Sequence, residues 1–401
     1  MTRANSRARP KILLVVGARP NFMKIAPIIR ALGAADAYDV ALVHTGQHYN
    51  AAMNDVFFTE LALPQPDVHL GVGSGSHAVQ TAAVMQAFEP VLERMGADLV
   101  VVVGDVNSTL AASLVAVKKG IPVAHVEAGL RSFDRSMPEE INRVLTDQIA
   151  ELLFTTEESA LGNLRREGIA PEKVFFVGNV MIDSLLHALP RAVPPARILE
   201  QHAGAAVGGS LEARFAAATL HRPSNVDDPV VLRRLLTTFR AIADRLPLIF
   251  PLHPRTAKMV EQHGLSSLLE HPAIHTLPPQ PYLVMVGLIS GATVVLTDSG
   301  GIQEETTGLG VPCLTLRENT ERPITVTEGT NRVVGTDQGL ILGAVDEILR
   351  AGGKAGRVPP LWDGHAAERI ADHIGRFFGL PTGHARSRGQ DPRIARSGAR
   401  S

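Results

Sequence analysis

The sequence contains a single cysteine, Cys313, which excludes a disulfide bond within the chain. This residue lies in VPCLTL, an apolar segment typical of a buried strand, so we predict a core residue and not a reactive thiol. No segment reaches the roughly 20 uninterrupted apolar residues that a membrane-spanning helix requires. The polar start, MTRANSRARPK, leads into an apolar run too short for a signal sequence. We therefore expect a cytoplasmic protein with no membrane partner.

An excess of charge of one sign is also absent. Lysine and arginine number 39 against 40 aspartates and glutamates, and the formal net charge is -1. A chain so balanced is not drawn as a whole toward nucleic acid or an anionic membrane. Among the 15 histidines no HExxH spacing occurs, and no Cys/His cluster exists. The sequence therefore predicts no metal site.

The length of 401 residues predicts two domains of about 150–200 residues each. Short Val-, Ile- and Leu-rich runs alternate with stretches of helical period, which is the βαβ pattern of a parallel sheet. The runs predict strands at 11–16, 39–44, 98–104, 122–126, 152–156 and 173–178, and again at 214–220, 246–252, 273–277, 292–297, 311–316 and 331–335. Helices are expected at 22–33, 77–95, 107–119, 138–150 and 363–379.

Two segments differ in composition from this repeating pattern. Residues 189–213 concentrate proline, glycine and alanine, which predicts a linker between two halves of the chain. Residues 381–401 are basic and polar, which favours a disordered, solvated tail over a binding segment. Two parallel-sheet domains usually hold a ligand between the carboxyl ends of their strands. The turns from strand to helix are therefore the places to search for a site.

The first such turn reads VVGARPNFMK and carries two cations, Arg19 and Lys24, at a helix N-terminus. Cations and free backbone N–H groups at this position suit a phosphate or another anion. The turn is neither a Walker loop nor a GxGxxG fingerprint, so ATP and NAD are not indicated and we expect no cofactor. The alternative is an ordinary helix start with two surface cations.

The corresponding turn of the second half reads DSGGIQEE. Ser299 is placed to cap the helix, and Gly300 and Gly301 let backbone N–H groups approach a diphosphate closely. Glu305 has the wrong sign for a phosphate but suits paired hydroxyls such as a ribose diol. The alternative is a tight turn that requires glycine, followed by a solvated pair of acids.

Acidic residues follow several strands of the first half. Asp105 lies in VVVGDVNST, Glu127 in AHVEAGLRS, and Glu139 in the helix start MPEEINR. Carboxylates that converge on one cleft would suit proton abstraction and donation, because crowding separates their pKa values. Each taken singly could equally be a helix cap or one half of an ion pair.

The second half adds two further candidates. His221, in TLHRPSN, could donate to a phosphate or transfer a proton, although a satisfied structural histidine is the alternative. Arg322, in TERPITVTEGTNR, lies in a loop after a strand and could contact a diphosphate or a ribose.

Together these motifs resemble the non-hydrolysing UDP-N-acetylglucosamine 2-epimerases. The resemblance rests on GARPNFMKIAP, TGQH, VVVGDVNST, HVEAGLRS, PEEINR, DSGGIQEE and TERPITVTEGTNR, which run from residue 17 to about 335 in the family's order. It implies a glycosyltransferase-B-like α/β fold, in which two Rossmann-like domains face a cleft. On this basis we expect a first domain of residues 1–190 plus 363–380 and a UDP-binding domain of residues 196–362.

The resemblance also implies a reaction. C2 of the sugar is inverted through 2-acetamidoglucal, formed when a base removes the C2 proton and UDP leaves from C1. UDP then adds back while a proton arrives on the opposite face, and neither nicotinamide nor metal is needed. A closed, dry cleft would be required to retain the intermediate.

Roles are carried over by motif. The implied catalytic residues are Lys24, Asp105, Glu127, Glu139 and His221, with Asp105 our choice for proton transfer on one face. The implied substrate contacts are Arg19, Lys24, His221, Gln280, Ser299, Gly300, Gly301, Glu305 and Arg322. Some members bind a second UDP-N-acetylglucosamine as an activator, and Gln47 and His48 of TGQH match part of that allosteric site. A homodimer is implied by the relatives.

Two departures from the family pattern leave the substrate open. HRPSN carries Pro223 and Ser224 where the bacterial pattern is HRREN, and the segment between Glu127 and Glu139 is shorter than in the best-known members. These differences leave room for a related substrate such as UDP-2,3-diacetamido-glucuronic acid. The sequence is also compatible with a hydrolysing epimerase, a glycosyltransferase of the same fold or a non-catalytic nucleotide-sugar-binding protein.

Overall fold

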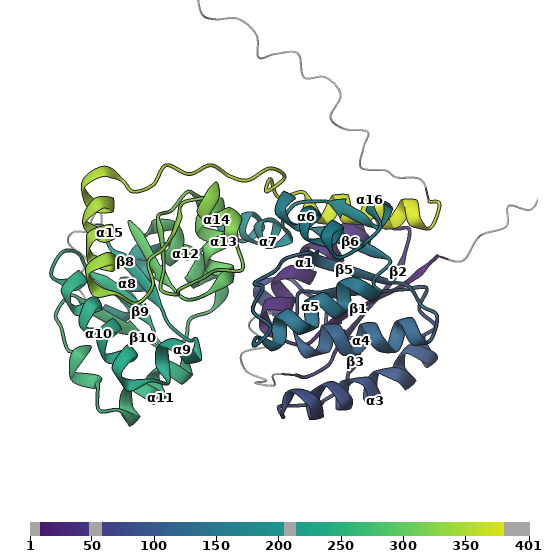
Figure 1. The fold of residues 1–401 in the computed structure, drawn as a ribbon, viewed down its shortest axis with the longest axis horizontal. Helices are drawn as coiled ribbons and strands as arrows, with labels where there is room; N and C mark the ends of the chain where they lie inside the picture. Colours follow the sequence, from purple (N-terminus) through teal and green to yellow (C-terminus); the bar gives the residue numbers. More distant parts are fainter. Residues whose placement is uncertain (1–8, 48–57, 204–213, 381–401) are drawn as a thin grey trace, which may run out of the picture.

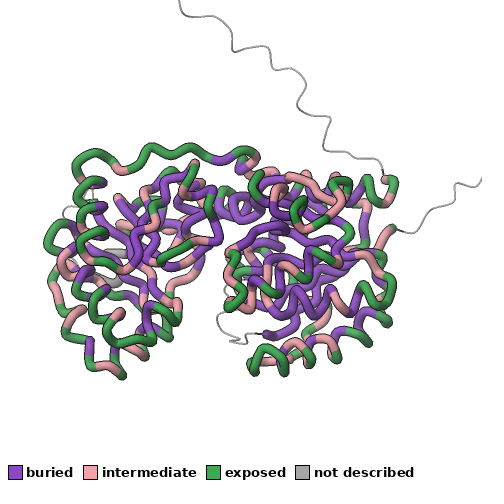
Figure 2. The backbone as a smooth tube through the Cα atoms, viewed as in Figure 1, coloured by how far each residue is buried: buried purple, intermediate pink, exposed green. Residues whose placement is uncertain are grey.

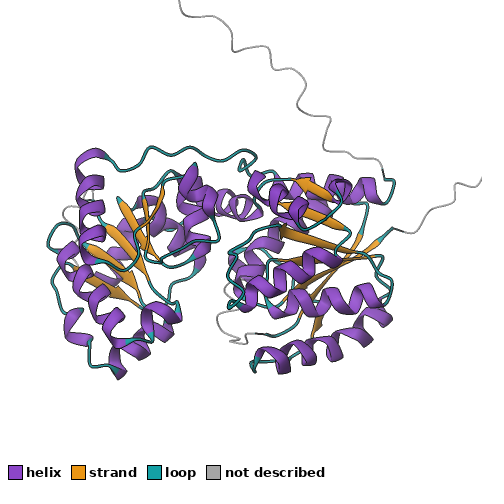
Figure 3. Cartoon of the chain, in the orientation of Figure 1, coloured by secondary structure: helices purple, strands orange, loops and turns teal. Residues whose placement is uncertain are grey.

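Two parallel β-sheets, each covered by helices on both faces, make up the protein (Figure 1 and Figure 3). The structure, a computed structural model, describes residues 9–47, 58–203 and 214–380. The expected tail at 381–401 and His48 lie outside the described residues. No helix within these described ranges is long and apolar enough to cross a membrane.

The first sheet has seven strands in the order β3-β2-β1-β4-β5-β6-β7. The strands are β1 (Lys11–Val16), β2 (Asp39–His44), β3 (Val68–His69), β4 (Leu99–Val103), β5 (Val123–Ala128), β6 (Leu152–Thr155) and β7 (Val174–Phe176). The helices are α1 (Arg19–Ala35), α3 (His77–Met95), α4 (Asn107–Lys118), α5 (Pro138–Ile149), α6 (Glu158–Arg166) and α7 (Val180–Ala188), with short 3-10 turns at Pro171–Lys173 and Leu189–Arg191.

The second sheet has six strands in the order β10-β9-β8-β11-β12-β13. The strands are β8 (Ala216–Thr219), β9 (Leu248–Pro251), β10 (Ile274–Leu277), β11 (Val294–Thr297), β12 (Cys313–Thr315) and β13 (Asn331–Val333). Its helices are α8 (Pro195–Ala203), α9 (Pro223–Val226), α10 (Pro229–Ala243), α11 (Pro254–Gln262), α12 (Tyr282–Gly291), α13 (Gly300–Leu309), α14 (Pro323–Thr327) and α15 (Gln338–Ala351), with a 3-10 turn at Ser266–Leu268.

Continuous apolar strands occupy the centre of each sheet because both faces are covered. All five residues of β4, LVVVV, are buried, and so are all four of β11, VVLT. Burial on both faces explains why these strands do not alternate between apolar and polar residues. Figure 2 shows the buried chain running through the middle of both halves. Cys313 is 1% exposed in β12 and burial raises the pKa of its thiol to about 12, which confirms the predicted core residue.

The C-terminal helix α16 (Ala366–Phe377) packs on the first sheet's helices although it follows the second sheet in the chain (Figure 1). Asp183 of α7 accepts hydrogen bonds from the Ala366 and Ala367 backbone N–H groups, at 3.2 and 2.7 Å. Tyr38 donates to the Ala371 carbonyl oxygen at 3.1 Å. These contacts support our proposal that the first domain comprises residues 1–190 and 363–380, and the second residues 196–362.

The predicted linker at 189–213 is wrong for its central part. Residues Pro195–Ala203 form α8, and Ile198 of this helix is 1% exposed in the core of the second sheet. The Pro-Pro and Ala-rich composition suggested a linker, but Ile198 packs in the core of the second sheet and helps to hold this segment as a helix. The predicted fold class, two Rossmann-like parallel-sheet domains of the glycosyltransferase-B-like type, is confirmed by the two sheets.

Candidate functional site

The carboxyl ends of both sheets carry the predicted site residues. In each sheet the strand order reverses direction beside the first strand, between β1 and β4 and between β8 and β11. Ligands bind at such switch points in open α/β sheets. Asp105 follows β4, Lys24 lies in α1, His221 follows β8, and Ser299 follows β11. The sequence motifs therefore meet where the topology predicts a ligand.

Glu127 has an unusual backbone for its residue type. Its φ is +74°, in the left-handed region that non-glycine residues rarely adopt, and it lies where the pairing of β5 with β6 shifts register between Val126 and Ala128. A bulge of this kind redirects a side chain. Here it aims the Glu127 carboxylate, 2% exposed, at Lys24 Nζ, 2.7 Å away. Strained backbone held in this way is characteristic of functional sites.

The turn after β1 is packed closely against the turn after β4. An added Cβ at Gly17 would lie 2.2 Å from Ser108 Oγ, so only glycine fits there. Lys24, 8% exposed in its side chain, reaches over Gly104 to Glu127. Lys24 is thus a buried cation paired with Glu127, and its role toward a substrate stays a prediction. The Arg19 side chain lies outside what the structure describes, although α1 begins at this residue.

A buried network of charges joins the two domains. Arg322 of the second domain donates from Nη2 to Glu127 Oε1 at 2.9 Å, and its Nε lies 2.9 Å from Glu304 Oε1. Asn179, at the start of α7 in the first domain, donates to the same Glu304 oxygen at 2.9 Å. We call Lys24, Glu127, Asn179, Glu304 and Arg322 the cross-domain network. Acidic and basic side chains alternate along this network, and its contacts cross twice from one domain to the other, through Arg322 with Glu127 and through Asn179 with Glu304.

The two carboxylates of the cross-domain network titrate in opposite directions. Burial acts to raise the pKa of Glu127, but the charges of Lys24 and Arg322 outweigh burial and hold its pKa well below the usual range. Burial raises the pKa of Glu304, and the charge of Arg322 compensates only in part. Neighbouring carboxylates with separated pKa values are the arrangement that acid–base chemistry uses.

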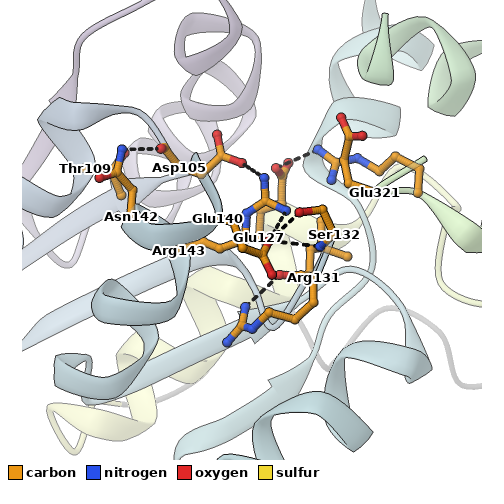
Figure 4. A network of polar contacts seen from close by, with 12 residues as sticks. Asp105, Thr109, Glu127, Arg131, Ser132, Glu140, Asn142, Arg143 and Glu321 are labelled. Atoms are coloured by element: carbon orange, nitrogen blue, oxygen red, sulfur yellow. Dashed lines mark hydrogen bonds and ion pairs between the residues drawn. The ribbon is translucent and has the colours of Figure 1, made fainter. Parts of the chain in front are cut away.

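Asp105 lies beside this network and is held by an arginine of α5 (Figure 4). Arg143 donates to Asp105 Oδ2 at 2.5 Å, and Asn142 donates to the Asp105 carbonyl oxygen at 2.9 Å. The Asp105 side chain keeps 21% of its surface exposed. The Arg143 charge is among those that lower the pKa of Glu127. Arg143 therefore binds Asp105 directly and acts on Glu127 through its charge.

Glu139 is half-buried in the first turn of α5. The neighbouring acid, Glu140, is the one inserted into the polar network: it accepts hydrogen bonds from the backbone N–H groups of Ser132 and Phe133 and lies 3.2 Å from Arg143 (Figure 4). Glu140 therefore orders the loop that precedes α5. Glu139 stands at the more open position, where its proposed catalytic role stays a prediction.

His221 forms a pair with a buried aspartate of the neighbouring strand end. Its Nδ1 lies 3.0 Å from Asp298 Oδ1, and Asp298 also accepts the backbone N–H groups of His221 and Arg222. Burial acts to raise the pKa of Asp298, but these contacts, that with His221 foremost, lower it overall. With Nδ1 engaged, Nε2 is the nitrogen that a ligand can contact, and the side chain is 35% exposed.

The DSGG turn differs from the prediction in one respect. Ser299 occupies the N-cap position of α13, but its hydroxyl makes no capping hydrogen bond, so the predicted cap is wrong. Gly300 meets Glu321 instead: an added Cβ would lie 2.8 Å from Glu321 Oε1. Gly301 is half-buried, with Met181 of α7 3.7 Å from the position of an added Cβ. The two glycines thus let protein side chains approach the start of the helix, and their predicted contact with a diphosphate stays a prediction.

Arginines surround Glu321 beside this turn. Arg317 lies 2.8 Å and Arg222 3.4 Å from its carboxylate oxygens. Burial acts to raise the pKa of Glu321, but the charges of Arg322, Arg317 and Arg222 lower it to about 2. The concentration of guanidinium groups around one carboxylate marks a region able to hold a further anion.

Glu305 lies deeper than its predicted role suggests. Its carboxylate is 3% exposed and sits beside the Tyr282 hydroxyl of α12, and burial raises its pKa to about 7. Within the described part of the chain, neither Glu305 Oε1 nor Tyr282 Oη has a hydrogen-bond partner of good geometry. An unpaired buried oxygen is costly, so hydroxyl donors from a ligand would be favourable here. A ribose contact requires movement of the groups that cover it.

We predict that Glu305→Gln makes stability less dependent on pH. The pKa of Glu305 is raised from 4.5 to about 7 in the folded protein, so the unfolded chain releases its proton first and stability falls as pH rises through this window. Relative to the variant, the wild type should lose roughly 2–3 kcal/mol of unfolding free energy between pH 5 and pH 8. Urea unfolding at both values measures the difference.

Glu261→Gln is the control for this prediction, because Glu261 is exposed in α11. Its unfolding free energy should follow the wild-type pH dependence. If the unfolding free energy of Glu305→Gln showed the same pH dependence as the wild type, Glu305 would not be a buried carboxylate with a raised pKa.

A cavity of about 560 Å³ opens between the domains. It is lined from the first domain by Asp134 and Met137, and from the second by residues that include Arg222, Ser224 and Arg317. Pro223 and Ser224, the departures from the family pattern, therefore line the space between the domains. The predicted cleft is present in the structure.

Two further predicted contacts lie around this site. Gln47 is 6% exposed, and its side-chain oxygen accepts hydrogen bonds from the Ser108 backbone N–H at 3.1 Å and hydroxyl at 2.8 Å. It therefore braces the start of α4 beside Asp105. Gln280 is half-buried in the loop before α12 and donates to the Pro278 carbonyl oxygen. Their roles toward a ligand stay predictions.

Several residues of the site were not predicted. They are Arg143, Asn179, Asp298, Glu304 and Glu321, which the contacts above connect to predicted residues. Each was adjacent to a recognised motif: Asp298 and Glu304 belong to DSGGIQEE, Arg143 ends PEEINR, and Glu321 precedes Arg322. Asn179 had only the weak signal of a polar residue after a strand. The described residues hold no group of three or more His, Cys, Asp or Glu side chains that could bind a metal.

Comparison with known proteins gives consistent matches. A family model described as UDP-N-acetylglucosamine 2-epimerase matches residues 30–375. The UDP-N-acetylglucosamine 2-epimerase of Methanococcus maripaludis is 40% identical over 367 residues, which cover 91% of this chain and 98% of that protein. The UDP-2,3-diacetamido-2,3-dideoxy-D-glucuronate 2-epimerase of Pseudomonas aeruginosa is 39% identical over 374 residues, covering 92% of this chain and 100% of that protein.

A solved structure is similar over the same extent. The crystal structure of Methanocaldococcus jannaschii UDP-GlcNAc 2-epimerase in complex with UDP-GlcNAc and UDP superposes with a TM-score of 0.82 at 41% identity. The match covers 91% of this chain and 99% of that chain. The similarity therefore extends over both domains.

Proposed function

This chain belongs to the UDP-N-acetylglucosamine 2-epimerase family, and we propose that it catalyses the reversible C2 epimerisation of UDP-N-acetylglucosamine to UDP-N-acetylmannosamine. The product would serve as a precursor of cell-surface polysaccharide. We also propose that the enzyme is a cytoplasmic homodimer that needs no cofactor, as the resemblance of its motifs implies.

The contact between Glu127 and Arg322 is the observation that carries this proposal. It brings a carboxylate of the first domain to 2.9 Å from a guanidinium of the second, beside a buried lysine. A binding protein for an anionic ligand gains nothing from carboxylates at this point, since they repel the ligand. An enzyme that moves a proton next to a departing diphosphate needs both kinds of group.

We propose the following division of roles. Arg322, Gly300, Gly301 and His221 hold the diphosphate, because they present donors at the carboxyl end of the second sheet. A diphosphate arriving there would compete with Glu127 for Arg322 and so release this carboxylate toward the sugar. Glu305 would accept hydrogen bonds from the ribose hydroxyls.

The carboxylates of the first domain would transfer the protons. One of Asp105, Glu127 and Glu139 takes the C2 proton while the C1–O bond breaks and UDP departs, which leaves a C1–C2 double bond. Another returns a proton to the opposite face of C2 as a UDP oxygen bonds again to C1. Asp105 is our choice for one of these transfers, since it is partly exposed and is oriented by Arg143.

A second candidate substrate has specific support. The Pseudomonas aeruginosa relative is a UDP-2,3-diacetamido-2,3-dideoxy-D-glucuronate 2-epimerase, and it is nearly as similar to this chain as the Methanococcus maripaludis relative. The reaction type would be the same, and only the sugar substituents would differ. Pro223 and Ser224, at the interdomain cavity, are where we expect the sugar preference to be decided.

The test is incubation of the purified protein with UDP-N-acetylglucosamine in deuterated water, followed by proton NMR. We expect UDP-N-acetylmannosamine that carries deuterium at C2, because the acid that delivers a proton to the opposite face of C2 has exchanged its own proton with the solvent. Free N-acetylmannosamine and UDP as end products would support a hydrolysing epimerase. Turnover of only the diacetamido-glucuronate compound, offered in parallel, would assign the second candidate.

A further inference from the structure

His125 forms a bridge between the strand ends that carry Asp105 and Glu127. It lies in β5, two residues before Glu127, and its side chain is completely buried. Ring nitrogen Nε2 lies 2.8 Å from the Gly104 carbonyl oxygen, and Nδ1 lies 2.6 Å from Asp147 Oδ1 in α5. The residue is a neighbour of the catalytic groups but touches none of them through its ring.

Both ring nitrogens of His125 face acceptors. A carbonyl oxygen only accepts hydrogen bonds, so Nε2 carries a hydrogen. Arg131 lies 2.7 Å from Asp147 Oδ2, and this oxygen also accepts the Gly129 backbone N–H, so Asp147 is an ionised carboxylate whose Oδ1 only accepts and Nδ1 also carries a hydrogen. The other charged groups are Arg131, 2.7 Å from Asp147 Oδ2, and Glu167, which pairs with Arg131. The ring is therefore an imidazolium in a closed network of charges.

The bridge contacts backbone groups next to both proposed catalytic carboxylates, Asp105 and Glu127. Gly104 directly precedes Asp105, and the remaining oxygen of Asp147 accepts the backbone N–H of Gly129, two residues after Glu127, at 3.0 Å. Glu127 has a φ of +74°, which is strained for a residue with a side chain, whereas the +67° of Gly104 is a conformation that glycine adopts freely. A strained backbone persists only when its surroundings over-determine it. The His125 ring and Asp147 supply that constraint from outside the cleft.

We propose that His125, acting with Asp147, is a positioning residue that sets the spacing between the Asp105 turn and the Glu127 bulge. The effect on turnover rests on the proposed function. The competing view is that this ion pair only stabilises the fold, as any satisfied buried pair does. The two views differ in what they predict. Loss of a purely stabilising pair would lower the free energy of unfolding and leave the turnover rate of the folded enzyme unchanged.

His125→Gln is the main test, because glutamine retains a donor but cannot bridge both acceptors. We expect kcat to fall about 10- to 100-fold, by analogy with the loss of the hydrogen-bonding partners that orient ligands in metal sites. The Kd for UDP, measured by calorimetry, should stay within about threefold, since the proposed UDP contacts His221 and Gly300 lie in the other domain. Asp147→Asn should lower kcat in the same direction, and provides a second variant if His125→Gln does not fold.

Tyr38→Phe is the matched control. It also removes one hydrogen bond from a buried side chain to a carbonyl oxygen in the same domain, but at the opposite end of the sheet. We expect its kcat within about twofold of wild type. A kcat for His125→Gln equally close to wild type would overturn the proposal.

Ring ¹⁵N spectra provide a test that does not need turnover. The His125 signals are those that disappear from the spectrum of His125→Gln. At neutral pH their chemical shifts should show a hydrogen on both ring nitrogens, whether or not the protein epimerises any UDP-sugar. A neutral ring would overturn the proposed bridge. Absence of epimerisation by the wild type, with the imidazolium present, would instead refute the proposed function and leave the bridge intact.

Discussion

Asp105→Asn is expected to lower turnover of UDP-N-acetylglucosamine at least about 100-fold, because asparagine can neither take nor return a proton. The change is nearly isosteric, and the Arg143 contact can persist through the amide oxygen. UDP affinity should therefore remain within a few-fold of wild type, as the proposed diphosphate contacts lie on the second domain. Steady-state kinetics and calorimetric titration with UDP measure the two quantities.

Asp346→Asn is the appropriate control for Asp105→Asn. Asp346 also pairs with an arginine, Arg245, at 2.7 Å, but its side chain is 52% exposed and lies in α15, away from the cleft. The Asp346→Asn variant should turn over UDP-N-acetylglucosamine at the wild-type rate. Wild-type turnover by Asp105→Asn would remove this residue from the mechanism and leave Glu127 and Glu139 as the proton-transfer groups.

Arg322→Gln is expected to destabilise the protein by about 3–5 kcal/mol, the cost of removing one partner from a buried ion pair. Its guanidinium, 8% exposed, contacts both Glu127 and Glu304, and the shorter glutamine cannot neutralise either. The same substitution should weaken UDP binding at least about tenfold through loss of a charged donor. Urea unfolding and calorimetry measure the two effects.

An exposed arginine provides the comparison for Arg322→Gln. Arg332 and Glu347 pair at 2.9 Å with side chains 53% and 50% exposed, so Arg332→Gln should cost no more than about 1 kcal/mol. Equal unfolding free energies for the two variants would contradict the assignment of Arg322 to a buried network. An unchanged UDP affinity in Arg322→Gln would remove it from the diphosphate site.

The strands could be predicted because their chemistry is local. Runs such as LVVVV in β4 are short, apolar throughout and rich in β-branched valine, which favours a strand covered on both faces. The linker was less predictable, since the composition of α8 resembles a loop, and the packing of Ile198 against the second core depends on residues distant in the chain. The Ser299 cap was wrong for a similar reason, because side-chain orientation at a helix start depends on what packs around it.

The site was predictable where a motif carries it. Lys24, Asp105, Glu127 and Arg322 follow from strand-end positions and the family resemblance, and the structure brings them together. The sequence pointed to Glu305 and not to its neighbour Glu304. Successive residues of a helix point about 100° apart, so one of the two faces Arg322 and the other faces Tyr282. Which acid faces the cleft depends on the rotation of α13 relative to the first domain.

The sequence by itself determined the fold class, the two parallel sheets and the family, because apolar periodicity and ordered motifs are properties of the chain alone. Only the tertiary structure decided which charges meet. The Glu127–Arg322 pair joins residues 195 positions apart, and the His125 bridge depends on a strand end, a helix and a bulge at once. Coulomb and hydrogen-bond energies depend on distances of a few ångströms, and the order of residues along a chain does not specify such distances.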